Sequence, residues 1–316
     1  MTAVAARQRV ETAGRGAGLK LAVAAAAVSG VAVYVNGEAV GRFPSPTVYT
    51  TGKNLVAGIL LVGVMVALAQ RPQHREPIAG PLERSEAAGL AVVAFIGGAV
   101  PFVLFFEGLS RATSSDAAFI HKTLVVWVAV LAAIFLREQV TIVHLASVAL
   151  LVVAQIAVAD GVGSLRPGVG EAMILAATLC WSVELILVKR LLETTHPSVV
   201  AASRIAGGAG LLTMLLLVTG RLEAIVTLTS SQWAWLALTG SILTVFVSVW
   251  FAAIARAQVV DVAAVLVLGA VITGTLDLVA GGAVVPTRAA GWVLILVVVG
   301  VLVTQRAVEE RRRVLT

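Results

Sequence analysis

Charged residues are scarce in this chain. Of its 316 residues, only 13% are Asp, Glu, Lys or Arg, while 59% are hydrophobic. A water-soluble domain needs more polar surface than this composition can supply. The mean hydropathy of +1.00 therefore excludes an ordinary soluble domain and indicates a protein that crosses a membrane several times.

Cysteine and clustered metal ligands are also nearly absent. The single cysteine, Cys180, lies in an apolar run and cannot form a disulfide within the chain. The sequence has no HExxH motif, no glycine-rich phosphate loop followed by Lys and Ser or Thr, and no carboxylates at metal-ligand spacing. We therefore expect no metal, no other cofactor and no enzymatic activity. The net charge of +6 is attributed to membrane orientation, and no nucleic-acid partner is expected.

Long hydrophobic runs make up most of the sequence. A helix needs about 20 mostly apolar residues to cross a hydrocarbon core of roughly 30 Å. Helices are expected because a lipid-exposed span must satisfy its own backbone hydrogen bonds. We therefore predict an all-α polytopic membrane protein with ten transmembrane helices, at residues 19–36, 48–69, 87–109, 115–136, 141–159, 169–188, 198–220, 233–255, 259–281 and 288–305.

Lys and Arg are unevenly distributed between the two sides of this arrangement. If the N-terminus is cytoplasmic, the inner segments carry fifteen of them and the outer loops carry five. Positive residues concentrate on the cytoplasmic side of membrane proteins. The sequence thus predicts a multi-pass protein of the plasma or inner membrane with both termini in the cytoplasm.

The two halves of the chain resemble each other. The segment WFAAIARAQVVDVAA (250–264) aligns with FFEGLSRATSSDAAF (105–119), and a second alignment relates the starts of the halves. In a chain rich in Ala, Val and Leu, the matched polar and proline positions carry the most weight. The matched pairs are Phe106 with Phe251, Arg111 with Arg256, Asp116 with Asp261, Pro46 with Pro197, and Lys53 with Arg204.

Five helices in each half make the second copy enter the membrane from the opposite side. The predicted organisation is a cytoplasmic tail (1–18), a first repeat (19–160), a linker (161–168), a second repeat (169–305) and a basic cytoplasmic tail (306–316). Two inverted five-helix repeats are the architecture of alternating-access transporters, which bind substrate near the midplane between the repeats. This pattern favours transport over other membrane functions.

The chain resembles the drug/metabolite transporter superfamily, in particular its ten-helix EamA-type members. The resemblance is carried by EGLSRATSSDAAF after the third helix, by FLREQVT at the end of the fourth, and by a fifth helix of small and branched residues. It implies the ten-helix fold and the export or exchange of small metabolites or drugs. Two departures are that the fourth and ninth helices lack the mid-helix proline common in the family, and that Glu138 has no acidic counterpart at Ala283.

Charge inside a predicted span is costly and needs a partner, a wet cavity or a route to the interface. The candidates that we single out are Lys53, Glu107, His121, Lys122, Glu184, Arg204 and Asp277. The long side chain of Lys53 could snorkel to the surface, and Glu184 could either pair with Arg204 or face the cytoplasm. We predict a substrate path formed by Lys53, His121, Lys122, Trp127, Trp181, Glu184 and Arg204, with Glu107 and Asp277 as possible charge partners.

Two interpretations of the adjacent pair His121 and Lys122 remain open. Lys122 either lines the transport path and attracts an anionic group, or is neutralised by Glu107 one helix earlier. His121 either titrates in proton coupling or makes a structural contact. Trp127 and Trp181 either form the wall of a pocket for an organic solute or pack in the protein core.

Two other functional classes are compatible with a polytopic chain. One is a membrane-embedded enzyme acting on lipid or isoprenoid groups, and the other is a channel or scaffold subunit. The sequence favours a secondary transporter of a small organic solute, with a small molecule, the bilayer and protons as partners. Both a monomer and a homodimer fit the sequence.

Overall fold

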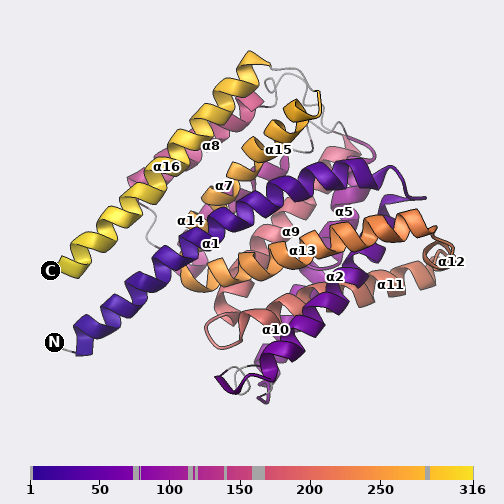
Figure 1. The fold of residues 1–316 in the computed structure, drawn as a ribbon, viewed down its shortest axis with the longest axis horizontal. Coiled ribbons are helices and arrows are strands. Elements are labelled where there is room, and N and C mark those ends of the chain that lie inside the picture. Colours follow the sequence, from indigo (N-terminus) through magenta and orange to yellow (C-terminus); the bar gives the residue numbers. More distant parts are fainter. Residues whose placement is uncertain are drawn as a thin grey trace.

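The structure is a computed structural model that describes residues 3–73, 78, 80–112, 117, 120–138, 141–158, 168–281 and 285–315. Every regular element in these ranges is a helix (Figure 1). The α-helices are α1 (Ala3–Val40), α2 (Pro46–Ala69), α4 (Arg84–Ile96), α5 (Val100–Leu109), α7 (Leu124–Leu131), α8 (Ile142–Val158), α9 (Val169–Leu191), α10 (Pro197–Ala202), α11 (Gly208–Val218), α12 (Glu223–Val226), α13 (Ser230–Arg256), α14 (Val259–Leu266), α15 (Leu268–Val279) and α16 (Pro286–Leu315). There are also two π-helices. η1 (Ala132–Leu136) follows α7 in the predicted fourth span, and η2 (Ser203–Gly207) lies between α10 and α11 in the predicted seventh span.

Eight helical segments among the described residues are long and apolar enough to cross a membrane. They match the predicted spans except 115–136 and 141–159, which correspond to the shorter apolar helices Ile120–Leu136 and His144–Ala157. The all-α multi-pass fold is therefore confirmed, and eight of the ten predicted spans are full-length helices within the described residues, whereas the other two include residues outside the described ranges. The eight are Gly16–Val40, Pro46–Ala69, Arg84–Leu109, Val169–Leu191, Pro197–Val218, Ser230–Arg256, Val259–Val279 and Pro286–Gln305.

The outer surface of the helices is apolar. Large side chains such as Ile59, Val218 and Val279 are 71%, 77% and 82% exposed. A surface of this kind is unfavourable in water and is suited to lipid acyl chains. The structure thus presents the bilayer-facing surface that the composition predicts.

The second helix of each half begins in the same way. Ser45 accepts a backbone N–H of the first turn of α2 at 3.2 Å, and Pro46 follows it. His196 caps α10 with a matching contact at 3.2 Å, and Pro197 follows it. Proline is favourable here because the N–H it lacks would have no partner within the helix. The matched prolines therefore mark equivalent helix starts.

The helices of the two halves pack in matching pairs. The first helix of each half packs on the third and fourth helices of the other: α1 packs on α13, α14 and α15, and α9 packs on α4, α5 and α7. The second helices pack on each other, α2 against α10, η2 and α11, and so do the fifth helices, α8 and α16 (Figure 1). Exchanging the halves thus reproduces these pairings.

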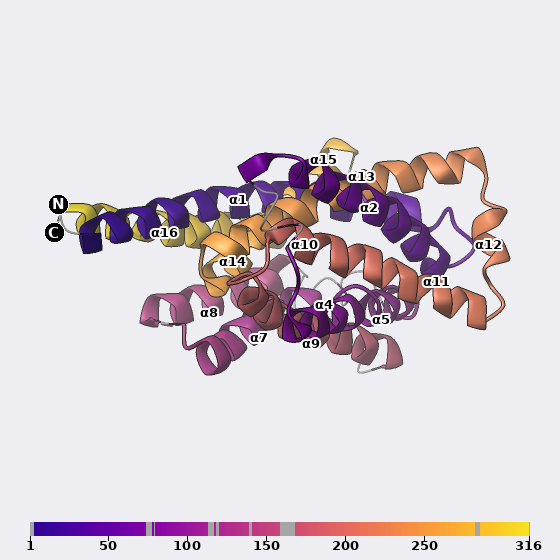
Figure 2. The same ribbon diagram turned by 90° about the horizontal axis from the view of Figure 1, so that it is seen from below.

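The helices α2 and α13 run in the same direction. Leu236 fills the space beside Gly52, where an added Cβ would lie 2.6 Å from its Cδ1 atom. Further along both helices, the Thr244 hydroxyl approaches the carbonyl oxygen of Ala57 at 3.5 Å. Both chain termini lie at one end of the molecule, where α1 and α16 extend together (Figure 2).

The fourth and ninth helices are interrupted even though neither contains a proline. α7 passes into the π-helix η1, which ends at Leu136 and is followed by the cap residue Arg137 with a φ of 52°. A break at Val267 separates α14 from α15. The missing mid-helix prolines therefore do not leave these helices continuous. Asp116 and Ala283, which the sequence comparison used, lie outside the described residues.

Candidate functional site

Lys53 is a buried cation without a carboxylate partner among the described residues. Its side chain on α2 is 3% exposed, and no ion pair involves it in the described part of the chain. Its Nζ donates to Oδ1 of Asn36 on α1 at 3.2 Å. The same atom lies 4.8, 5.1 and 5.6 Å from the ring centroids of Phe106, Tyr49 and Phe102. Aromatic faces attract cations, so rings and one amide surround the ammonium in place of a counter-ion.

Other polar groups near Lys53 on α2 also lack partners. The hydroxyl of Thr50 and both amide atoms of Asn54 are buried and make no hydrogen bond to any described residue. Positions three and four residues apart share one side of a helix. Thr50 lies three residues before Lys53 and Asn54 follows it, so these groups occupy one side of α2. Buried polar groups are normally satisfied, which makes this side of the helix a candidate for ligand or water contacts.

Arg204 occupies the matching position in the second half but has a counter-ion. Its Nη2 donates to Oε2 of Glu184 on α9 at 3.0 Å. Its Nε also lies 2.6 Å from Oε1, at an angle that makes no second hydrogen bond. Both side chains are buried. The sequence had left two positions open for Glu184, and the structure pairs it with Arg204.

A break in the third helix makes room for this pair. Between α4 and α5, a Cβ added at Gly97 would lie 2.3 Å from Cδ of Glu184, and one added at Gly98 would lie 1.9 Å from the carbonyl oxygen of Arg204. Only glycine fits such close approaches. The carbonyl oxygen of Gly97 also accepts a hydrogen bond from Trp181 Nε1 at 3.1 Å. Arg204 itself lies in η2, and π-helical turns are frequent at functional sites.

Lys53 and Arg204 both lie close to the ring of Phe102. Lys53 Nζ is 5.6 Å and Arg204 Cζ is 5.9 Å from its centroid. Phe102 meets Trp181 edge-on at 5.6 Å, and Trp181 contacts the His121 ring at 5.1 Å. His121 Nδ1 is buried and makes no hydrogen bond to any described residue. We define the central cluster as Asn36, Lys53, Phe102, His121, Trp181, Glu184 and Arg204.

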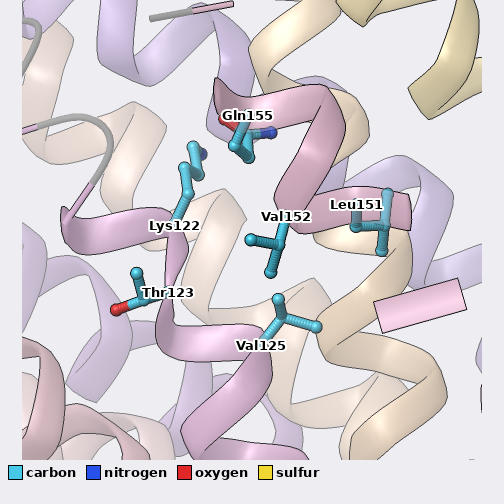
Figure 3. Close-up of a pocket in the computed structure, with 6 residues that line it drawn as sticks. All are labelled: Lys122, Thr123, Val125, Leu151, Val152 and Gln155. Atoms are coloured by element: carbon cyan, nitrogen blue, oxygen red, sulfur yellow. The ribbon is translucent and has the colours of Figure 1, made fainter. Parts of the chain in front are cut away.

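Lys122 faces a different pocket from the central cluster. It extends toward Gln155 of α8 (Figure 3). The Gln155 side chain is buried, and its Nε2 makes no hydrogen bond to any described residue. The other residues lining this small pocket are Thr123, Val125, Leu151 and Val152. Adjacent residues on the fourth helix thus diverge, His121 toward Trp181 and Lys122 toward α8.

Glu107 has partners other than Lys122. Its Oε1 accepts a hydrogen bond from the hydroxyl of Thr47 at 2.8 Å. Its Oε2 lies 3.5 Å from Nη2 of Arg111, one helical turn away. The structure therefore contains no Lys122–Glu107 ion pair.

The remaining two predicted residues lie at the surface. Trp127 is 38% exposed on α7, and its Nε1 donates to the Thr123 hydroxyl at 3.1 Å. Asp277 is exposed near the C-terminal end of α15 and belongs to no ion pair within the described ranges. The structure thus brings Lys53, His121, Trp181, Glu184 and Arg204 together and places Trp127 and Asp277 elsewhere.

A second polar group, the end cluster, holds the turn between α13 and α14. Glu138 accepts the first two backbone N–H groups of α14 at 2.9 and 3.3 Å. His144 Nε2 lies 3.1 Å from Oδ1 of Asp261. Lys189 donates at 2.7 Å to two carbonyl oxygens at the end of α13. Burial raises the pKa of Glu138, and the two backbone donors and Lys189 partly oppose this. The end cluster consists of Glu138, His144, Lys189 and Asp261, drawn from both halves.

Several of these residues have only weak signals in the sequence. Asn36 and Phe102 are an ordinary amide and an ordinary aromatic residue until the tertiary structure places them against Lys53. The run GGAVP at 97–101 does indicate a helix break. Gln155 is one of three buried polar residues on α8, with His144 and Ser147, and its amide could have been considered as a partner for Lys122.

Comparison with known proteins places this arrangement in a family. The model of the EamA-like transporter family matches residues 16–159 and 168–305, one copy in each half. The chain belongs to the EamA-like transporter family. This confirms the predicted membership of the drug/metabolite transporter superfamily. The family's members are transporters, so the EamA-like chain is assigned to membrane transport.

A solved structure has the same fold as this EamA-like chain. It is described only as the crystal structure of a protein and shares 15% sequence identity. The similarity has a TM-score of 0.73 and covers 92% of this chain and 99% of the other. At this identity the likeness shows the fold alone. No curated protein matches the chain.

Proposed function

We propose that this EamA-like protein is a secondary transporter that moves a small organic metabolite or drug-like solute by alternating access, as an exporter or exchanger. The observation that carries the proposal is the central cluster, in which matching cations from the two halves lie on one aromatic ring. Carriers built from inverted repeats bind substrate near the midplane, at the interface between the repeats. The central cluster lies at such an interface.

Helix directions support an inverted relation between the halves. In the first half, Thr47 contacts Glu107 and Lys53 contacts Phe102, so the second and third helices are antiparallel. The third helix of the second half, α13, nevertheless runs parallel to α2. This follows if the second half is inverted relative to the first. Ten crossings, the two shorter apolar helices included, would then return the chain to the side on which it began.

The residues of the path have distinct proposed roles. Lys53 and the Arg204–Glu184 pair provide the polar centre, and Trp181 with its neighbouring rings contacts the solute. His121, whose Nδ1 lacks a described partner, is the candidate for proton coupling because an imidazole ring can pass a proton between its two nitrogens. Lys122 and Gln155 form a second polar site between the fourth helix and α8, and Trp127 lies on the exposed surface of α7.

In this proposal the end cluster closes the solute path on the side of the α13–α14 turn. It contains residues of both halves, so solute exchange on that side requires its contacts to separate. Under the predicted topology this is the cytoplasmic side, in a plasma or inner membrane with both termini in the cytoplasm. Reporter fusions test this orientation, because a C-terminal tag that is accessible from outside the cell would contradict it.

Transport by the purified protein in liposomes tests the proposal directly. A panel of organic solutes is loaded inside or outside, and flux is followed with and without an imposed pH gradient. A carrier moves at least one solute with saturable kinetics, and the pH gradient drives accumulation if protons are coupled. Absence of flux across the whole panel would contradict the proposal. Flux that does not saturate and far exceeds a carrier cycle would indicate a channel instead.

A further inference from the structure

We propose that Lys53 binds the carboxylate of a small monoanionic organic acid with an apolar or aromatic body, and that such acids are the substrates of this protein. The inference rests on the proposed transport function and names its substrate class. It comes from an asymmetry between the two halves. Each half places a buried cation at the same position, but among the described residues only the second half supplies a counter-ion.

The two cations are equivalent in sequence and structure. Lys53 follows Pro46 by seven residues, and Arg204 follows Pro197 by seven residues. Each contacts a polar side chain on the first helix of its own half. In the second half that side chain is the carboxylate of Glu184, as the Arg204 ion pair shows. In the first half it is a neutral amide.

A buried ammonium without a counter-ion is unfavourable. A buried charge that lacks its partner is strongly destabilising, and a cation over an aromatic face recovers only part of that loss. Lys53 has three N–H donors, of which Asn36 takes one. The remaining donors, together with the unsatisfied Thr50 and Asn54 side chains, can bind the oxygens of a carboxylate.

The surroundings of Lys53 limit the charge and shape of the ligand. A cationic solute would be repelled by the ammonium. A dianion would need a second free cation, but Arg204 is already neutralised by Glu184. The rings of Phe102 and Phe106 lie beside the ammonium and suit an apolar body. A monocarboxylate therefore supplies in the first half the charge that Glu184 supplies in the second.

Substituting Asn36 with Glu tests this assignment, because Asn36→Glu builds into the first half the counter-ion that the second half already has. The probes are three monocarboxylates, benzoate, phenylacetate and hexanoate, and the amides of the same acids. Thermal unfolding of the purified full-length chain in detergent detects binding without any need for transport. We expect at least one acid to protect the wild type and its amide to protect less.

The variants separate charge from size. Asn36→Glu and Lys53→Met are expected to lower the acid-over-amide preference by about tenfold or more, the effect of losing one strong charge contact. Lys53→Arg and Asn36→Gln keep the charge balance and are expected to retain a preference for the acid. If Asn36→Glu does not fold, the comparison of Lys53→Met with Lys53→Arg gives the same information.

The inference and the proposed function fail in different ways. If no acid protects the wild type better than its amide, or if the preference survives in both Asn36→Glu and Lys53→Met, the substrate assignment is overturned. Transport of other solutes in the liposome panel would then still stand. Acid binding that is lost in Asn36→Glu, in a protein that transports nothing, would support the Lys53 site and contradict the transport function.

Discussion

Lys53 and Arg204 lie over the same aromatic ring, with Nζ at 5.6 Å and Cζ at 5.9 Å from the centroid of Phe102. They come from the second helices of the two halves, which pack against each other. Two like charges can share one ring at low cost only if the charge of at least one is balanced. Glu184 balances Arg204, so the two positions are equivalent in sequence but different in charge.

Removing the charge of Glu184 is expected to destabilise the protein. Glu184→Gln leaves the Arg204 guanidinium buried without a counter-ion, and losses of about 3–5 kcal/mol are typical of such changes. The matched control is Glu107→Gln, since the partly exposed Glu107–Arg111 pair is expected to contribute less than about 1 kcal/mol. Thermal or denaturant unfolding in detergent measures both. If the two variants were equally stable, the claim that Arg204 is buried and depends on Glu184 for charge compensation would be wrong.

Gly97 is expected to tolerate no larger residue. In Gly97→Ala the new Cβ would lie 2.3 Å from Cδ of Glu184, and overpacking of this kind costs about 1–3 kcal/mol. Gly63→Ala is the control, because nothing lies within 4 Å of that position. Alanine in a helix is favoured over glycine by about 0.5–1 kcal/mol, so the control is expected to equal or exceed the wild type in unfolding temperature. A loss of stability in Gly63→Ala as large as that in Gly97→Ala would rule out the close approach as the cause.

Lys122 is expected to affect the rate of transport without affecting its selectivity. The pocket that Lys122 lines with Gln155 is separate from the central cluster. Lys122→Met therefore removes the charged group of this pocket and leaves the Lys53 site intact. We expect solute flux in liposomes to fall by about tenfold, the effect of roughly 1.4 kcal/mol, with an unchanged acid-over-amide ratio. Wild-type flux in a variant that inserts normally would remove Lys122 from the transport path.

The pH dependence of stability is expected to change in Glu138→Gln. Burial raises the pKa of Glu138 in the folded protein, so the folded state holds the proton more tightly than the unfolded chain. The resulting stability is fully present below the unfolded pKa of about 4.3 and is lost as pH rises through the folded pKa. Unfolding temperature measured between about pH 4 and pH 8 should therefore decline less steeply in Glu138→Gln. His144, Lys189 and Asp261 remain in both proteins, so parallel curves would show that Glu138 does not carry this effect.

Much of the helical framework could be predicted because burial in lipid leaves a strong sequence signal. The predicted spans around α2, α9 and α13 agree with full-length helices. The Lys53–Arg204 equivalence also followed from the sequence, since both residues stand at a fixed distance from a proline. In contrast, the predicted fourth and fifth spans are described only as the apolar helices Ile120–Leu136 and His144–Ala157, because neighbouring residues lie outside the described ranges.

The contents of the site were less predictable because they depend on helix contacts between distant segments. Nothing local indicates that Asn36 bonds Lys53 or that Phe102 lies beside both cations. In the sequence, Glu138 is distinctive only because the second half has no acidic counterpart. In the structure, its carboxylate caps the N-terminus of α14. Helical periodicity indicates which residues share a face, but the neighbouring helix determines what they contact.

Trans-stimulation in liposomes tests the central claim, that two halves carry solute past the central cluster by alternating access, most directly. Liposomes containing the purified protein are loaded with an unlabelled transported solute, and uptake of the same labelled solute from outside is measured. We predict faster uptake into loaded than into empty liposomes, because a carrier that returns with solute bound exposes its site again. Uptake that is equal in loaded and empty liposomes and does not saturate would contradict alternating access.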